Sequence, residues 1–141
     1  MVDSDLILLK AGSVTKYLER VRLKSDTDLD TFLLDLDRQE SIMFNLQQAV
    51  QICIDIAAHI VSDEGYGVPG STSEMFYLLE DNGIIEKEIT EKMVLAVGFR
   101  NLVAHEYEKI DIERVFKAAR ENTRDLVAFI QAVFKKLGIT G

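Results

Sequence analysis

The sequence predicts an all-α domain built as an antiparallel bundle of about five helices. Three observations support this fold class. Only one of the 141 residues is proline, so long stretches contain no residue that would interrupt a helix. Apolar residues recur at intervals of three and four, which is the spacing of one helix face. The alternation of apolar and polar residues that is typical of strands is almost absent.

Two helices are expected in the N-terminal half. The first covers residues 5–24, because Val14, Leu18 and Val21 keep the helical period and the polar segment 25–28 ends it. The second is expected over residues 29–61, which keep an apolar period throughout. This length suits the central helix of a bundle or a surface shared with another subunit. A break near residues 39–41 is left open.

Three more helices follow a loop at residues 63–73, which contains three of the eight glycines and the only proline. Ser71 and Glu74 have the spacing of a capping box and start a short helix, which Asn82 and Gly83 end. A fourth helix is expected over residues 86–105. A fifth begins at Asp111 and carries its apolar residues on one face.

The composition limits the class of protein. A chain of this length is expected to form a single domain over residues 1–141. Its 16 basic and 24 acidic residues give a net charge of −8, so any contact with RNA has to be local. The lone Cys53 cannot form an intrachain disulfide, which fits a reducing compartment. We read no secretory signal and no apolar stretch of membrane-spanning length, and therefore expect a cytoplasmic protein without membrane contact.

Charge is distributed unevenly along the chain. Residues 10–24 contain five basic and one acidic residue, a net +4, whereas residues 26–40 contain six acidic and one basic, a net −5. On the last helix, Lys117, Arg120 and Arg124 lie close to one face. Two interpretations are open. In the first, the charged segments are ordinary solvated faces. In the second, residues 10–24 and the basic residues of the last helix form two basic stripes that flank a phosphate-binding groove.

Several kinds of site are not expected. The sequence lacks the Walker A lysine motif and the Gly-x-Ser-x-Gly motif, which excludes the common P-loop and serine-hydrolase signatures. The Glu-x-x-His pattern of di-iron sites is absent at both histidines. We expect no metal site and no cofactor. Cys53 lies in the apolar run 52–54 and is expected to be a buried filler, not a nucleophile.

The segment 98–107, Gly-Phe-Arg-Asn-Leu-Val-Ala-His-Glu-Tyr, places four polar side chains at the end of an apolar helix. Asn101 and His105 lie one turn apart on one face, with Arg100 beside it. Arg100 offers a planar cation for phosphate oxygens, and His105 is able to transfer a proton near neutral pH. Metal-free RNA cleavage needs these groups. The alternative is structural: Arg100 pairs with an acidic neighbour, His105 caps the helix and Tyr107 packs at the rim.

Residues 100–107 match the Arg-x4-His-x-Tyr motif, and the chain resembles the HepT-like branch of the HEPN superfamily, the toxin half of HEPN/MNT toxin–antitoxin systems. The resemblance covers nearly the whole chain. It includes residues 53–60, the Gly/Pro loop before Ser71, the segment 79–85 and the Gly98-Phe99 lead-in, all in the family's order.

The resemblance implies a two-fold homodimer of helical bundles, with the Arg/His motifs of both chains meeting in a cleft at the interface. It implies a metal-independent endoribonuclease toxin of a type VII-like pair, which cleaves RNA. His105 is then the catalytic acid or base, Arg100 the phosphate-binding cation and Asn101 the residue that orients them. Tyr107 takes the place of the tyrosine to which the cognate MNT nucleotidyltransferase antitoxin adds AMP, silencing the toxin.

Two other functions remain open from the sequence. One is a non-catalytic HEPN dimer that acts as a binding scaffold or a substrate of the nucleotidyltransferase, which the acidic composition favours. The other is a plain structural dimer. His59 is expected to be a hydrogen-bonded, partly buried histidine outside the site. Asp55, one turn before it, is the hypothetical hydrogen-bond partner.

Overall fold

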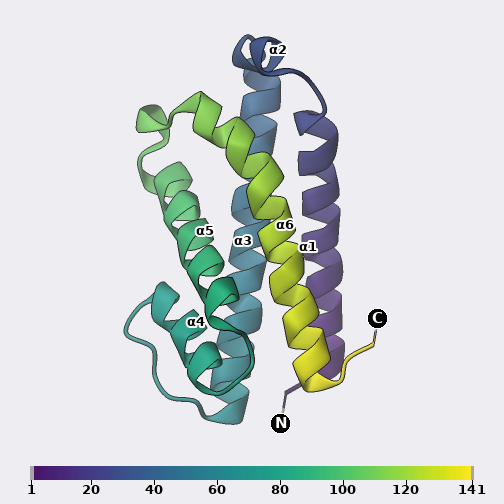
Figure 1. Ribbon diagram of the computed structural model, residues 1–141, viewed down its shortest axis with the longest axis vertical. Coiled ribbons are helices and arrows are strands. Elements are labelled where there is room, and N and C mark those ends of the chain that lie inside the picture. Colours follow the sequence, from purple (N-terminus) through teal and green to yellow (C-terminus); the bar gives the residue numbers. More distant parts are fainter. Residues whose placement is uncertain (1, 141) are drawn as a thin grey trace.

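The computed structural model describes residues 2–140 and confirms the all-α class (Figure 1). Its elements are α1 (Ser4–Ser25), α2 (Leu29–Leu33), α3 (Leu36–Glu64), α4 (Thr72–Asp81), α5 (Lys87–His105), the 3₁₀ helix η1 (Tyr107–Lys109) and α6 (Ile112–Leu137). The described residues contain no strand. Over residues 2–140 the antiparallel bundle has six α-helices, where about five were expected.

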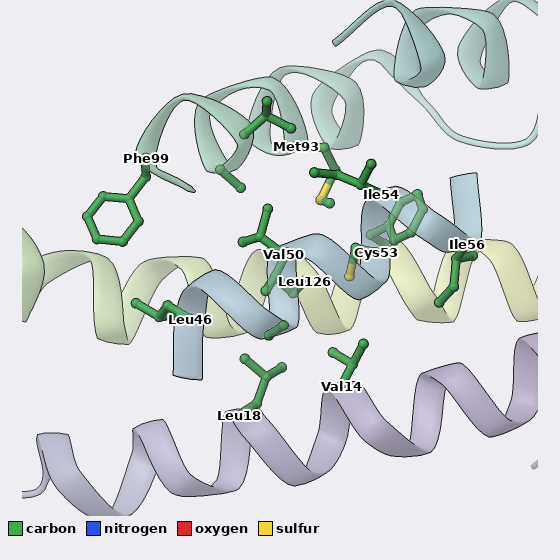
Figure 2. Close-up of a cluster of buried hydrophobic side chains, with 14 of the residues drawn as sticks. Val14, Leu18, Leu46, Val50, Cys53, Ile54, Ile56, Met93, Phe99 and Leu126 are labelled. Atoms are coloured by element: carbon green, nitrogen blue, oxygen red, sulfur yellow. The ribbon is translucent and has the colours of Figure 1, made fainter. Parts of the chain in front are cut away.

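The helix α3 is the centre of the bundle, because it contacts each of the other five α-helices. Its apolar residues meet those of α1, α5 and α6 in one continuous core. Figure 2 shows Val50 and Cys53 of α3 in one cluster with Val14 of α1 and Leu126 of α6. Burying one large apolar side chain contributes about 1.5–3 kcal/mol, so this core is the main source of stability.

The expected second helix is divided, and the division lies at Leu34 and Asp35 instead of near residues 39–41. The Asp35 carboxylate accepts a hydrogen bond from the Arg38 backbone N–H (3.1 Å), which caps a new helix at that point. Gln39 lies past the break and is buried, donating from its amide to the Phe32 carbonyl (2.9 Å). The apolar period passes through the break unchanged, so periodicity alone did not locate it.

The predicted helix ends around α4 are confirmed. The Ser71 hydroxyl accepts a hydrogen bond from the Glu74 backbone N–H (3.1 Å) at the N-terminus. At the C-terminus Gly83 has a φ of 75°, in the left-handed region where a glycine avoids the strain of a side chain. The following Ile84 N–H bonds to the Leu79 carbonyl (2.9 Å) and directs the chain back toward α5.

The bundle has two distinct ends (Figure 1). The first and last described residues lie at the lower end in this view, together with α4. The opposite end carries α2, the C-terminus of α5, η1 and the start of α6. Within the described residues, no helix combines the length and the hydropathy that a membrane span requires.

Candidate active site

The residues of the Arg-x4-His-x-Tyr segment occupy the last two turns of α5 and the turn that follows it. Asn101 and His105 are exposed on the outer side of α5, one turn apart as predicted. Gly98, a turn earlier, is also exposed and has no atom within 4 Å of the position that a Cβ would take. The outer face therefore leaves space for a close approach by another molecule.

Arg100 faces a different side of the helix from His105. Five residues at about 100° each place the two side chains roughly 140° apart around the axis, and Arg100 is partly buried. Its Nε is buried with no hydrogen-bond partner among the described residues. A buried donor without a partner is costly, so this guanidinium is poised for an acceptor from outside the chain. Arg100 is therefore next to Asn101 in the sequence, but its side chain lies on a different side of α5 from the face that Asn101 and His105 share.

The turn after α5 brings His105 and Tyr107 to one place. The Glu106 N–H bonds to the Leu102 carbonyl (2.8 Å), and the Ile110 N–H to the Tyr107 carbonyl (3.3 Å). Ile110 is buried and anchors the end of η1 in the core. His105 and Tyr107 line one open hollow of about 380 Å³ with residues 104, 106, 108 and 109. Tyr107 is 47% exposed, so this residue is accessible from solvent.

The predicted basic stripe on α6 is not a free charged face. The Arg120 guanidinium stacks over the Phe116 ring (4.4 Å) and donates to the Thr27 carbonyl (3.4 Å), which fastens α6 to the segment after α1. Lys117 pairs with Glu121 (4.0 Å). On α1, Arg22 pairs with Glu19. For these residues of the two basic stripes, the structure supports the interpretation as ordinary surface charges and not as a phosphate-binding groove.

One cation near the site was missed by the sequence analysis. Arg114 lines a groove of about 330 Å³ between α5 and α6, together with Leu95, Phe99 and Lys117. Arg114 belongs to no motif, and its position in the first turn of an amphipathic helix gives no signal. The packing of α5 against α6 places Arg114 in this groove, which is separate from the hollow of His105 and Tyr107.

Cys53 is fully buried between the helices, which confirms the predicted filler (Figure 2). Burial disfavours the charged thiolate and raises the pKa of this thiol far above its usual range. A thiol in that state is neither a nucleophile nor a metal ligand at neutral pH.

His59 is partly buried near the end of α3, as expected. The hypothesis that Asp55 is its hydrogen-bond partner is not supported: among the described contacts Asp55 accepts a hydrogen bond from the Gln51 amide (3.1 Å) and none from His59. Asp55 and Asp63 each lie four residues from His59, a spacing that by itself allows a metal ligand pair. The part of the chain that the structure describes nevertheless holds no group of three or more His, Cys, Asp or Glu suited to a metal ion.

Residues 65–70 spell Gly-x-Gly-x-x-Gly, a pattern associated with dinucleotide binding. That function requires a strand before the glycines and a phosphate site at the following helix. Here the glycines follow the C-terminus of α3, a helix, and Gly65 with a φ of 68° is its C-cap. The pattern is a helix stop followed by a loop.

Comparison with known proteins gives one family. The family model described as "Ribonuclease HepT-like" matches residues 14–133. The mRNA nuclease HepT of Shewanella oneidensis is 28% identical over 130 residues, which cover 92% of this chain and 97% of the relative. The tRNA nuclease HepT of Aphanizomenon flos-aquae is 30% identical, covering 83% and 80%.

A solved structure gives the same result. The tri-AMPylated Shewanella oneidensis HEPN toxin, in complex with its MNT antitoxin, superposes with a TM-score of 0.86 at 28% sequence identity. The match covers 96% of this chain and 99% of that one. Fold and sequence therefore agree over almost the full length of both proteins.

Proposed function

Since this chain belongs to the ribonuclease HepT-like family, we propose that it is the toxin of a HEPN/MNT toxin–antitoxin pair, a metal-independent endoribonuclease that AMP addition to Tyr107 silences. The observation that carries the proposal is that His105 and Tyr107 line one open hollow at the end of α5. A group added to Tyr107 stands beside the proposed catalytic imidazole. One location thus accounts for both the activity and its control.

The proposed cleavage uses the ribose itself as the nucleophile. His105 accepts the proton of a 2′-hydroxyl, and the 2′-oxygen attacks the adjacent phosphorus. The bond from phosphorus to the 5′-oxygen breaks, and that oxygen takes up a proton from solvent while the His105 imidazolium releases one to solvent, so no net proton is consumed. The products are a 2′,3′-cyclic phosphate and a 5′-hydroxyl. Arg100 stabilises the negative charge that develops on the phosphoryl oxygens, and Asn101 orients the reacting groups.

We propose that two copies of the chain form the site. Arg100 and His105 lie on different sides of α5, so one chain does not aim both at the same phosphate. A two-fold axis beside the outer face of α5 brings each motif against its copy. Leu95 is 66% exposed on this helix, and an apolar residue there suits an interface.

The substrate range of the proposed enzyme follows from the parts of the RNA that Arg100 and His105 would contact. An Arg/His pair contacts phosphate and ribose and reads no base edges, so it accepts many sequences in single-stranded regions. Of the two relatives, one is named an mRNA nuclease and the other a tRNA nuclease. We propose that this protein acts on messenger or transfer RNA in the cytoplasm.

Silencing adds charge and bulk next to His105. The Tyr107 hydroxyl oxygen attacks the α-phosphorus of ATP bound by the antitoxin, pyrophosphate leaves, and the hydroxyl proton is released. Each AMP unit places a negative phosphate beside the hollow, which repels and excludes an RNA phosphate. The tri-AMPylated relative supports this proposal by its fold and sequence likeness.

The chemistry of the product ends tests the proposed reaction. A short RNA is cut in EDTA, beside the same RNA carrying a 2′-deoxy nucleotide at the cleavage position. The expected products are a 2′,3′-cyclic phosphate and a 5′-hydroxyl, with no cleavage of the 2′-deoxy substrate. Cleavage of that substrate, or products with 5′-phosphate ends, would contradict a 2′-hydroxyl mechanism.

A second candidate function is a non-catalytic HEPN dimer that serves as scaffold or substrate of the nucleotidyltransferase. The net charge of −8 favours it, because that charge opposes RNA binding. A folded, unmodified dimer that cuts no RNA yet accepts AMP would establish this second function.

A further inference from the structure

The connection from α1 to α3 places leucines at the surface. Leu34 is 90% exposed and Leu36 is 60% exposed, and Leu33 beside them is also exposed. Leu34 and Leu36 line an open hollow of about 530 Å³ with Thr31, Asp35 and Asp37. We call these three leucines, with Asp35 and Asp37, the leucine tip. Exposed apolar side chains gathered at one place mark interaction sites.

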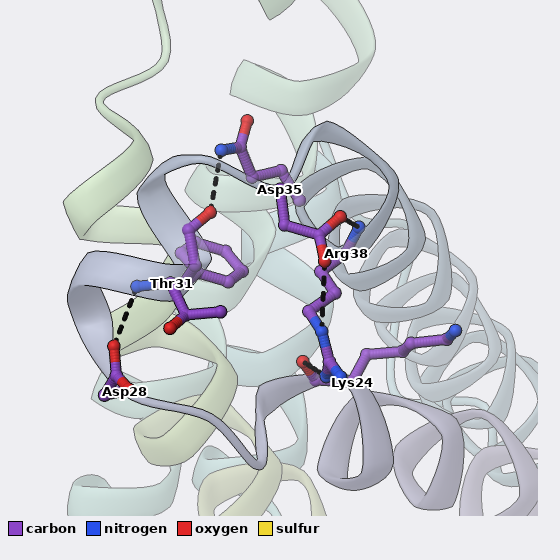
Figure 3. Close-up of polar contacts among 7 residues, drawn as sticks. Lys24, Asp28, Thr31, Asp35 and Arg38 are labelled. Carbon is purple, nitrogen blue, oxygen red and sulfur yellow. Dashed lines mark hydrogen bonds and ion pairs between the residues drawn. The ribbon is translucent and has the colours of Figure 1, made fainter.

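Hydrogen bonds hold the leucine tip in one shape (Figure 3). They run from the Thr31 N–H to the Asp28 carboxylate (2.7 Å), from the Arg38 N–H to the Asp35 carboxylate (3.1 Å), from the Arg38 guanidinium to the Lys24 carbonyl (3.0 Å) and from the Gln39 amide to the Phe32 carbonyl (2.9 Å). An exposed surface that is already ordered loses little entropy on binding. The order of the tip therefore lowers the entropic cost of binding a partner there.

The charge around the leucine tip restricts what binds there. Residues 26–40 carry six acidic and one basic residue, and Asp26, Asp30, Asp37 and Glu40 are all exposed. This field repels RNA phosphates. A second copy packed symmetrically on the tip would bring two segments of net −5 together. The fitting occupant is a protein surface with apolar residues surrounded by lysine and arginine.

The position of the leucine tip connects it to Tyr107. Phe32 of α2 packs on Phe116 of α6, with ring centroids 5.0 Å apart. Phe116 lies one turn into α6, which starts three residues after η1 ends. The tip, η1 and the end of α5 thus share one end of the bundle (Figure 1). A partner held on the tip is therefore at the same end of the bundle as η1, which begins at Tyr107.

We propose that the leucine tip is the docking surface for the nucleotidyltransferase antitoxin, which binds it through an apolar patch surrounded by basic residues. This inference rests on the proposed function. The leucine tip is a different surface from the hollow of His105 and Tyr107. The partner therefore stays bound to the tip while its nucleotide site contacts the tyrosine. The tip raises the efficiency of modification without taking part in RNA cleavage.

The test uses full-length unmodified protein and its antitoxin. The double variant Leu34→Ser/Leu36→Ser removes the apolar contact at two exposed positions, so folding is preserved. AMP addition to Tyr107 is followed by intact mass while the toxin concentration is varied. The expected result is a KM for the toxin raised about tenfold or more, with kcat unchanged. The control, Val68→Ser, changes an exposed side chain in the loop at the other end of the bundle and leaves both constants unchanged.

Direct binding of antitoxin to the same variants, measured without ATP, separates this proposal from the proposed function. Weaker binding by the double variant supports the tip even where no AMP is transferred. Equal binding and equal AMP transfer by the double variant and the wild type overturn it. Loss of the dimer, or an altered KM for RNA, assigns the tip to a second copy or to RNA and equally overturns it. Charge reversal by Asp37→Lys is expected to weaken antitoxin binding in the same way, most strongly at low salt.

Discussion

Tyr107 is an exposed residue and lines the same hollow as His105. The proposed role of Tyr107 in silencing and the proposed role of His105 in cleavage are separable by substitution. Phenylalanine keeps the ring and removes only the oxygen that would receive AMP.

The Tyr107→Phe variant is predicted to cut RNA at the wild-type rate and to stay active after incubation with antitoxin and ATP. Intact mass and RNA cleavage are measured on the same samples. Tyr77→Phe is the matched control, since Tyr77 is also exposed, at 48%, and lies on α4. AMP addition to the Tyr107→Phe variant would show that another residue is the acceptor.

The roles of individual residues were predictable to different degrees. The burial of Cys53 followed from its apolar neighbours, and the exposure of Asn101 and His105 from helical spacing. The partial burial of Arg100 was not predicted, although Arg100 has helical spacing from the buried Ala96, Val97 and Val103. The position of Arg114 in the groove beside Phe99 was not predicted either, because it depends on how α5 packs against α6.

At the scale of elements, α2 depends on one side-chain cap. The Asp28 carboxylate accepts a hydrogen bond from the Thr31 N–H (2.7 Å), and this bond holds the pKa of Asp28 below its usual value. A carboxyl whose pKa is lowered by folding stabilises the folded state above its unfolded pKa, which is about 3.9. That stabilisation is lost as the pH falls through the folded pKa.

The Asp28→Ala variant is therefore predicted to have a lower Tm than the wild type at pH 6, and the difference shrinks as the pH falls below about 4. Thermal unfolding of both proteins between pH 6 and pH 3 measures it. Asp28→Asn is the control, because asparagine caps a helix and does not titrate. A Tm difference between the Asp28→Ala variant and the wild type that stays constant over this range contradicts the assigned cap.

The division between α2 and α3 shows why some boundaries were not predicted. Ser71, Gly83 and Asp111 mark their helix ends by residue type, and the structure confirms all three. Leu34 and Asp35 lie within an unbroken apolar period. The cap at Asp35 becomes effective because Gln39 and Arg38 supply bonds from the next turn, a combination with no short sequence signature.

At the scale of the whole molecule, the proposed functional features lie at one end of the bundle. The proposed catalytic hollow, the proposed acceptor tyrosine in η1 and the leucine tip all lie opposite the end where the described chain starts and stops (Figure 1). The fold class was readable from the sequence because helix patterning is local. The shared location of these features could not be predicted from the sequence, because it depends on how α2 packs on α6.

The central claim is that the His105 imidazole cleaves RNA without a metal. The most direct measurement is the rate of RNA cleavage in excess EDTA by mass-verified, unmodified protein, beside His105→Ala and the matched control His59→Ala. We predict cleavage by the wild type and by His59→Ala, and a loss of about 10²-fold or more in His105→Ala. Undiminished cleavage by a folded His105→Ala protein, or none by the unmodified wild type, would contradict the claim.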